Sequence, residues 1–281
     1  MKLLVTGANG MLGRAVVEAA TRLGHDVRGL SRGELDITDA GAVRRSMLQW
    51  RPQAVVNSAA YTDVDGAESD PVAAEAINGV GAGNVAAAAA EVGASILQIS
   101  TDYVFDGSKR EPWLESDPVA PLGAYGASKL AGEQAVAAAN PVHAIVRTAW
   151  LFGAGGRNFV DTMLALASTR DEVAVVTDQV GCPTWTGHLA EALVDLAERP
   201  SQTGIHHIAG AGSCAWNELA IEVFDGAGVD CRVLPTTSDA FPRPAPRPAY
   251  SVLGSERARP LTLAPWQEGV AHYLATRVPA R

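Results

Sequence analysis

The chain has 281 residues, a length that suits one main domain with a smaller dependent lobe better than two independent cores. Hydrophobic residues make up 47% and charged residues 19%, which is typical of a packed globular protein and excludes long disordered regions. The net charge of −9, without a local run of Lys and Arg, excludes nucleic acid as an expected partner.

No apolar stretch reaches the roughly 18 residues that a membrane span needs, and Met1 leads directly into an apolar run without a basic region and cleavage site. We therefore expect no membrane partner and a cytoplasmic location. The cysteines, Cys182, Cys214 and Cys231, are odd in number and show no CxxC spacing. Buried free thiols are expected, and neither a disulfide framework nor a structural zinc site is indicated.

The first half of the chain alternates short apolar runs with segments of helix length. Residues 2–7 form an apolar run that ends in glycine, and an apolar-periodic segment follows over 11–23, so a strand and then a helix are predicted. Further strands are predicted at 27–30, 54–60, 96–101 and 144–150. The segments between them, including the alanine-rich block 85–90, predict helices on both faces of a parallel sheet. The expected fold class is α/β, a Rossmann-like doubly wound parallel sheet.

Beyond residue 150 the alternation becomes less regular. A loop is predicted at 153–156, a strand at 173–176, and helices at 158–167, 187–198 and 215–227. The proline-rich stretch 241–248 predicts an ordered surface loop or a flexible lid. We expect a smaller, discontinuous C-terminal substrate lobe. The dinucleotide-binding domain is assigned residues 1–149 with parts of 176–204 and 245–260, and the substrate-binding lobe residues 150–175, 205–244 and 261–281.

Gly7, Gly10 and Gly13 lie three residues apart where the first strand turns into the first helix. In a dinucleotide site, Gly7 would permit the tight turn, Gly10 would let the backbone approach a pyrophosphate, and Gly13 would let helix and strand pack closely. The N–H groups and positive dipole of the helix start, at Met11 and Leu12, would face the diphosphate. A glycine triplet alone is a weak signal, but its position at the first strand-to-helix junction predicts a dinucleotide site.

The end of the second predicted strand bears on the choice of dinucleotide. An NAD site usually carries an acidic residue there, whereas this chain places Arg32 after the strand. Arg32 would pair with a 2′-phosphate, which favours NADPH, although Glu34 and Asp36 follow closely and NADH stays possible. The alternative interpretation, that Arg32 is a solvated loop cation, is left open by the sequence.

Tyr125 and Lys129 are four residues apart near a predicted helix start, so their side chains share one helix face. Reduction of a ketone needs a proton donor, and a nearby ammonium is expected to lower the pKa of the Tyr125 phenol from about 10 toward neutrality. Thr101 and Asp102 stand at the end of the strand 96–101, the edge where open α/β sheets bind ligands. Thr101, Tyr125 and Lys129 are thus a candidate catalytic triad, and a strand-end cap is the alternative for Thr101.

Together, several blocks of the sequence resemble the extended short-chain dehydrogenase/reductase family, and within it the dTDP-4-dehydrorhamnose reductases. The resemblance covers nearly the whole chain. It rests on TGANGMLG (residues 6–13), DITD (36–39), NSAAYTDVDGAE (57–68), STDYVFDG (100–107), YGASK (125–129), RTAW (147–150), DQVGCPT (178–184) and RPAPRP (243–248).

The resemblance implies a position for the cofactor. Asp36 and Ile37 would flank the adenine, and Ala59, Ala60 and Tyr61 would pass beneath the dinucleotide. Some family members are described as dimers with a bridging Mg²⁺. The sequence shows no metal-ligand spacing, so no metal ligand is assigned, magnesium stays possible, and the chain is expected to be a monomer or a homodimer.

The resemblance also implies a nucleotide-sugar substrate. Thr101 and Asp102 would contact the sugar, Tyr125 would be the proton donor, Lys129 would also bind the nicotinamide ribose, and Trp150 would pack on the deoxyhexose. Trp150 in the core is an equally open interpretation. We expect NADPH-dependent reduction of the 4-keto group of dTDP-4-dehydrorhamnose. A second hypothesis places Arg247 of the proline-rich loop on the nucleotide diphosphate, with the lobe closing over the sugar.

Another nucleotide-sugar 4-ketoreductase of the same family is one alternative, and two further functions share parts of this pattern. A nucleotide-sugar epimerase or dehydratase would use the same glycine loop and Tyr/Lys pair, but the dehydratases place Asp-Glu after the threonine, where this chain has Asp102 and Tyr103. A non-catalytic NADP-binding regulatory protein would be expected to lose part of the triad, which is complete here.

Overall fold

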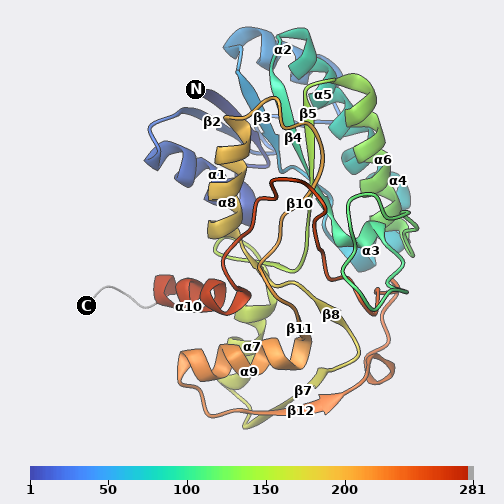
Figure 1. Ribbon diagram of the computed structural model, residues 1–281, viewed down its shortest axis with the longest axis vertical. Helices are drawn as coiled ribbons and strands as arrows, with labels where there is room; N and C mark the ends of the chain where they lie inside the picture. The colour runs from blue at the N-terminus through green and yellow to red at the C-terminus, as the bar shows by residue number, and fades with distance from the viewer. Residues whose placement is uncertain (278–281) are drawn as a thin grey trace.

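The computed structural model describes residues 1–277, whose main body is a six-stranded sheet (Figure 1). Its strands run in the order β10-β5-β4-β3-β1-β2, and every neighbouring pair is parallel. They are β1 (Lys2–Thr6), β2 (Asp26–Leu30), β3 (Ala54–Asn57), β4 (Ser95–Thr101), β5 (His143–Thr148) and β10 (Gly204–His207). The central strands β3 and β4 are buried along their whole length, as expected for a parallel sheet with both faces covered.

Helices cover both faces of this sheet. Alternate residues of β1 point to opposite faces, so Leu3 packs with α1 (Met11–Arg22) and α8 (Thr186–Ala197), while Leu4 packs with α2 (Ala40–Trp50), α5 (Ala82–Glu91) and α6 (Ala124–Ala139). Figure 1 shows the two layers on either side of the strands. The α/β, doubly wound fold class predicted from the alternation is confirmed.

The chain reverses its direction of travel across the sheet at β1. β2 pairs with one edge of β1, and β3 pairs with the other edge. In doubly wound sheets the crevice outside the carboxyl ends of the strands at such a switch point is the ligand site. The turns after β1, β3 and β4, which carry most of the predicted site residues, therefore meet at one edge.

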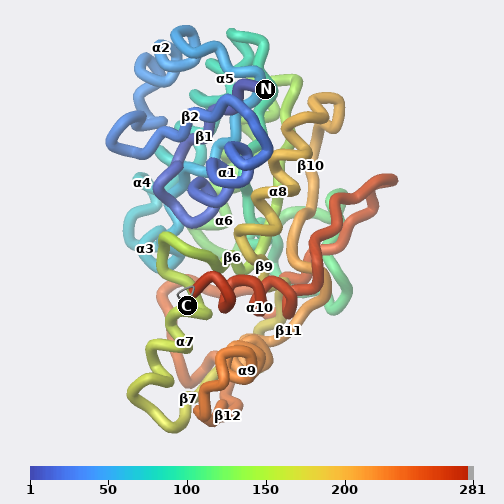
Figure 2. Tube along the Cα trace, turned by 90° about the vertical axis from the view of Figure 1, so that its left-hand side faces the viewer, coloured from blue at the N-terminus to red at the C-terminus, as the bar shows by residue number. Residues whose placement is uncertain are grey.

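A smaller lobe lies below the carboxyl edge of the sheet (Figures 1 and 2). Its helices are α7 (Phe159–Ala167), α9 (Trp216–Ala227) and α10 (Trp266–Arg277), and its parallel strand pair is β7 (Glu172–Val176) with β12 (Arg232–Thr236). Short pairs join β8 (Val180–Gly181) to β11 (Cys214–Ala215) and β6 (Leu151–Phe152) to β9 (Thr184–Trp185). Met163, Val173, Leu219 and Val270 contribute to a hydrophobic core separate from those of the sheet.

The connection from β3 to β4 contains three short helical segments before α5. They are α3 (Val64–Ser69), α4 (Pro71–Glu75) and the π-helical turn η1 (Ala76–Gly81). The 3₁₀ turns η2 (Asp102–Val104) and η3 (Ser238–Ala240) complete the elements. Asp63 and Asp70 accept the N-cap hydrogen bonds of α3 and α4.

Three sequence-based boundaries need correction. The strands predicted at 54–60 and 144–150 end at Asn57 and Thr148, because the chain then turns across the carboxyl edge, with Trp150 in the left-handed region at φ +46°. Residues 205–207, assigned to the substrate lobe, belong to β10, which pairs with β5 in the main sheet. The short segment GIHH of β10 has too few apolar residues to be recognised by periodicity.

The three cysteines are free and buried, as expected. Within residues 1–277, no helix combines the length and the apolar character needed to cross a membrane.

Candidate active site

The glycine turn after β1 is built so closely that side chains are excluded. Gly7 has φ +66°, and a Cβ there would lie 2.7 Å from the backbone nitrogen of Ala59. A Cβ at Gly13 would lie 2.3 Å from the carbonyl oxygen of Gly7. Gly10 caps α1 without a side-chain hydrogen bond, and the first turn of α1 has no acidic residue. The helix start therefore presents N–H groups and positive dipole to an anion, which fits the diphosphate of a dinucleotide.

Arg32 is exposed beyond the end of β2 and makes no ion pair with any of residues 1–277. The two acidic residues that follow it are engaged locally. Glu34 accepts from the Ser31 hydroxyl and amide, and Asp36 accepts from the amide and hydroxyl of Thr38, which lowers the pKa of both carboxyls. The Arg32 guanidinium can therefore bind an added phosphate group, as the NADPH prediction requires.

Asn78 fixes the loop that follows β3 and was not predicted as a site residue. Its side chain accepts from the Tyr61 amide at 2.9 Å, and donates to the Tyr61 carbonyl at 3.0 Å and to the Ser128 hydroxyl at 2.9 Å. Ser128 in turn donates to the carbonyl of Tyr125 at 2.8 Å. The predicted cofactor loop, with Ala59 and Tyr61, is thereby tied to the helix that carries Tyr125. Asn78 lies in η1, and π-helical turns are frequent at functional sites.

Thr101 and Tyr125 meet at the carboxyl edge of β4. Burial raises the pKa of Tyr125 to about 12, a hydrogen bond with the Thr101 side chain opposes this rise, and the charge of Asp102 adds to it. Tyr125 is consequently protonated at neutral pH and able to donate a proton. Lys129 is not among the groups that act on the phenol, so the expectation that it lowers the pKa of Tyr125 is not met in this structure.

Lys129 shares the inner face of α6 with Tyr125. The residue is only 4% exposed, and its ammonium donates to the carbonyl oxygen of Ile99 at 2.6 Å. Burial lowers the pKa of Lys129 to about 8, and the charge of Glu133 opposes this shift. The three predicted triad residues thus come from the end of β4 and from one face of α6.

A buried ion pair lies one turn further along α6. Glu133 and Arg147, 3% and 2% exposed, make two hydrogen bonds of 2.9 and 2.7 Å, and Ser100 donates to Glu133 at 2.5 Å. The pair joins α6 to β4 and β5 directly beside the triad. Glu133 was not predicted as a site residue, and Arg147 was given only as part of the motif RTAW, without a role. The sequence signal that could have predicted the pair is Arg147 itself, since an arginine within the apolar strand 144–148 is buried and a buried charge requires a partner.

Asp102 is held inside the protein. Its side chain is 2% exposed and accepts from the Thr101 hydroxyl at 3.0 Å. Burial raises the pKa of Asp102 to about 6, and hydrogen bonds from Ser251 and Thr101 oppose this rise. Its contact with substrate stays a prediction.

The acidic motif after β3 has structural partners. Asp63 caps α3, and Glu68 accepts from the Ala124 amide at 2.7 Å, which caps the start of α6 next to Tyr125. Asp65 holds Arg247 in a two-point pair of 2.8 and 3.0 Å. This pair fastens the proline-rich loop to α3, and the guanidinium lowers the pKa of Asp65. If Arg247 binds the substrate diphosphate, its guanidinium must either leave Asp65 or donate to both groups at once.

Trp150 is stacked on Trp216, with ring centroids 3.5 Å apart and planes 4° from parallel. A Cβ on Gly181 would lie 2.4 Å from the Trp150 ring, so Gly181 allows the indole to approach β8. Trp216 also donates to Gln179 at 3.1 Å. One indole face of Trp150 is thus covered by the lobe, and packing of the half-buried ring on a sugar stays a prediction.

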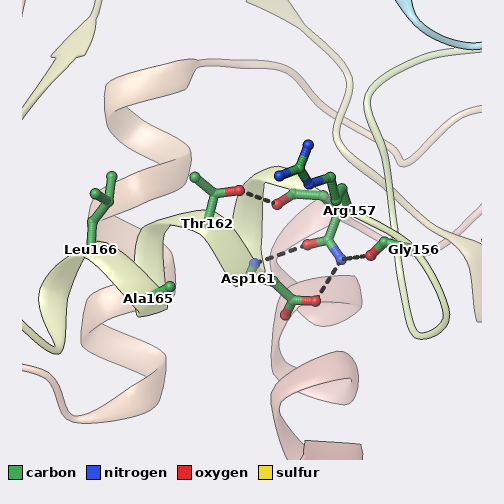
Figure 3. A pocket seen from close by; sticks show the side chains of 7 residues that line it. Gly156, Arg157, Asp161, Thr162, Ala165 and Leu166 are labelled. Atoms are coloured by element: carbon green, nitrogen blue, oxygen red, sulfur yellow. Dashed lines mark hydrogen bonds between the residues drawn. The ribbon is translucent and has the colours of Figure 1, made fainter.

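A separate open hollow runs along α7 (Figure 3). Its wall includes Asn158, which caps α7 by accepting from the Asp161 amide and donates to Gly153 and Gly156. The loop before it packs on α1, because a Cβ on Gly156 would lie 2.6 Å from the Met11 side chain. The hollow contains none of the predicted catalytic residues. The approach of Gly156 to Met11 shows that the loop before α7 reaches the start of α1.

Among the described residues, no group of three or more His, Cys, Asp or Glu side chains converges to hold a metal ion. Neither this geometry nor the relatives described below support Mg²⁺.

A doubly wound sheet with a glycine turn, a strand-end threonine and a Tyr-x-x-x-Lys helix at one edge is the arrangement of the extended short-chain dehydrogenases and reductases. The sequence pattern described as RmlD substrate binding domain matches residues 1–278. The chain belongs to this family.

Relatives of known name agree with this assignment. A dTDP-4-dehydrorhamnose reductase from Streptomyces griseus is 50% identical over 268 residues, which cover 93% of this chain and 88% of the relative. A probable dTDP-4,6-dihydroxy-2-methyloxan-3-one 4-ketoreductase from Streptomyces antibioticus is 46% identical over 95% of this chain and 92% of the relative. The crystal structure of a dTDP-4-dehydrorhamnose reductase from Bacillus anthracis in complex with NADP is 38% identical, with a TM-score of 0.95 over 98% of this chain and 99% of the other.

Removing one charge of the buried pair should destabilise the protein strongly. In Glu133→Gln the Arg147 charge would stay buried without its counter-charge, at an expected cost of about 3–5 kcal/mol in the free energy of unfolding, measured by urea denaturation. Glu91→Gln, which neutralises the exposed partner of Arg44, is the matched control and should have little effect. Equal stability of the two variants would contradict the assigned importance of the buried pair.

Asp102 should make stability depend on pH. The pKa of Asp102 is raised in the folded protein, so the folded state holds the proton more tightly than the unfolded state does. The free energy of unfolding therefore decreases as the pH rises from about 4 to above 6. Asp102→Asn should therefore gain about 1–3 kcal/mol over the wild type at pH 7.5 and little at pH 4. Urea denaturation at both pH values measures this, and a gain independent of pH would contradict the raised pKa.

Proposed function

We propose that this chain catalyses the NADPH-dependent reduction of the 4-keto group of dTDP-4-dehydrorhamnose, giving dTDP-L-rhamnose. The observation that carries the proposal is that Thr101 contacts Tyr125 at the sheet edge that also holds the glycine turn, with buried Lys129 one turn further along α6. The names of the relatives from Streptomyces griseus and Bacillus anthracis support the substrate, and the bound NADP of the latter supports the cofactor.

The glycine turn and the loop after β3 are suited to hold the dinucleotide. Gly7, Gly10 and the α1 start would take the diphosphate, while Arg32 would take the 2′-phosphate. Asp36 and Ile37 would border the adenine. When bound, NADPH supplies the hydride for carbon 4 of the sugar. The chain would also divide into a dinucleotide-binding domain and a substrate lobe as predicted, except that β10 belongs to the main sheet.

The chain's own residues supply the proton and the positioning. Tyr125, protonated at neutral pH, would donate its phenolic proton to the carbonyl oxygen as that oxygen becomes a hydroxyl. The Thr101 hydroxyl, which lies against the phenol, would orient the same oxygen. Lys129 would bind the nicotinamide ribose from the inner face of α6.

The lobe would bind the rest of the substrate. Trp150 would border the deoxyhexose, with its ring orientation fixed by Trp216. Arg247 would lie near the nucleotide diphosphate, on a loop that Asp65 already holds against α3. A rigid wall of this kind favours binding because little side-chain entropy is lost when the substrate arrives.

A second candidate is reduction of another nucleotide-linked 4-keto sugar. The 46% identity to the probable 4-ketoreductase from Streptomyces antibioticus favours this candidate. An elimination reaction is less suited to the site, since Tyr103 follows Asp102 where a dehydratase would carry a glutamate base.

Purified chain should oxidise NADPH in the presence of dTDP-4-dehydrorhamnose. The decrease in nicotinamide absorbance measures turnover, and chromatography with mass and NMR analysis identifies dTDP-L-rhamnose as the product. Absence of turnover with this sugar, together with activity on another nucleotide-linked 4-keto sugar, would support the second candidate instead.

Tyr125→Phe should lower turnover by about 100-fold or more, because the proton donor is lost, while NADPH binding is largely retained. Fluorescence titration of NADPH measures the binding. Tyr250→Phe, which removes a phenol outside the predicted triad, is the control. Near-normal turnover of the Tyr125 variant would show that another group donates the proton.

Arg32→Ala should weaken NADPH binding and leave NADH binding nearly unchanged, because the guanidinium would pair only with the 2′-phosphate. A loss of about 1.5–3 kcal/mol, the usual contribution of a hydrogen bond to a charged group, corresponds to roughly 10- to 150-fold in Kd. Equal loss for both cofactors would identify Arg32 as a residue of structural importance only.

A further inference from the structure

Two histidines face each other on the side of the molecule where α8 meets α10. Nε2 of His188 lies 3.0 Å from Nδ1 of His272, and the rings are 5.1 Å apart at 83°. His272 is exposed and His188 is half-buried, so solvent reaches the pair. The predicted active site uses neither residue.

Trp185 in β9 orients both imidazoles. Its indole ring meets His188 edge to face, with centroids 4.7 Å apart at 78°, and lies 5.5 Å from the His272 ring. Gly269 lets α10 come close, because a Cβ there would lie 3.1 Å from the Trp185 side chain. The two ring nitrogens are therefore aimed at each other by packing, as well as by their hydrogen bond.

Carboxylates lie one turn away on the same two helices. Glu191 is three residues after His188, and Glu268 is four residues before His272, so each shares a helix face with its histidine. Burial and His272 lower the pKa of His188, while the charges of Glu191 and Glu268 oppose this shift. Glu191 now pairs with Arg22 on the surface, at 2.6 Å.

We propose that His188 and His272 bind one divalent transition-metal ion of the zinc class between α8 and α10. Imidazole nitrogen is a preferred ligand of such ions, and a tetrahedral ion with bonds of about 2.0–2.1 Å holds two nitrogens roughly 3.3 Å apart, close to the separation seen here. Water would complete the coordination around these two protein ligands. Binding would displace the proton that lies between the two facing nitrogens, and this proton would move to the other nitrogen of its ring or to water.

The ion would connect the two parts of the molecule. α8 packs on α1 in a core of the main sheet, whereas α10 contributes Val270 and Tyr273 to the core of the lobe. An ion that binds only when the two helices are docked stabilises the folded protein in proportion to its concentration and affinity. The site therefore predicts metal-dependent stability without any part in the reduction itself.

The test is a Zn²⁺ titration of the full chain, prepared without a histidine tag and treated with a chelator. Calorimetry should give one ion per chain, and the thermal midpoint should rise with added Zn²⁺. His188→Ala and His272→Ala should each weaken binding by at least about 10-fold, since even second-shell partners of metal ligands contribute 10- to 100-fold. In both variants the rise in the thermal midpoint should be lost.

Two controls locate the ion. His25→Ala removes an imidazole whose Nδ1 lies 3.1 Å from the terminal amine, so this variant tests another place where two nitrogens are close together. His143→Ala removes a ring that is hydrogen-bonded to the Asn140 carbonyl. Both should bind Zn²⁺ like the wild type. Cu²⁺ should quench indole fluorescence in the wild type and much less in Trp185→Phe, because Trp185 borders the site.

Unchanged Zn²⁺ affinity in His188→Ala and His272→Ala would overturn the proposal, as would loss of binding in His25→Ala. Because His272 is exposed, its variant is expected to fold, and circular dichroism verifies this.

Discussion

The buried ion pair between Glu133 and Arg147 is the constraint on which the arrangement of the site depends. Two charges removed from water are tolerated only while they remain paired and hydrogen-bonded, so the position of α6 along β4 and β5 is strongly restricted. Tyr125 and Lys129 precede Glu133 on the same helix at spacings of eight and four residues. The ion pair thus helps to hold α6, and with it the phenol, in place relative to Thr101.

The parallel sheet brings the other half of the site to this position. Because all six strands run in one direction, the turns after β1, β3 and β4 leave the sheet at a common edge. Gly7 presses its turn against Ala59, and Asn78 connects Tyr61 to α6, so backbone packing and one buried amide join three consecutive segments. Positions that would each be ordinary alone form the proposed dinucleotide site through this convergence.

The lobe contributes side chains whose positions are fixed by one another. Trp150 is stacked on Trp216, and Arg247 of the proline-rich loop is paired with Asp65 of α3. Such contacts reduce the freedom of these residues before any substrate binds, which is the physical meaning of a preorganised site. The two-histidine pair on the opposite side joins the same two parts of the chain. Lobe and sheet are thus connected at several places.

The sequence by itself determined the features that depend on neighbours along the chain. The alternation of apolar runs and helices, the glycine turn and the Tyr125–Lys129 spacing all follow from periods of two to four residues, and the structure agrees with them. Tertiary structure alone decided the partners of polar side chains and the place of β10. Arg247 finds Asp65 from 182 positions away, and Asn78 finds Ser128 from 50. No local pattern encodes such pairs, because a buried charge or amide shows in the sequence only that it needs a partner, whereas the packing of distant segments selects which one.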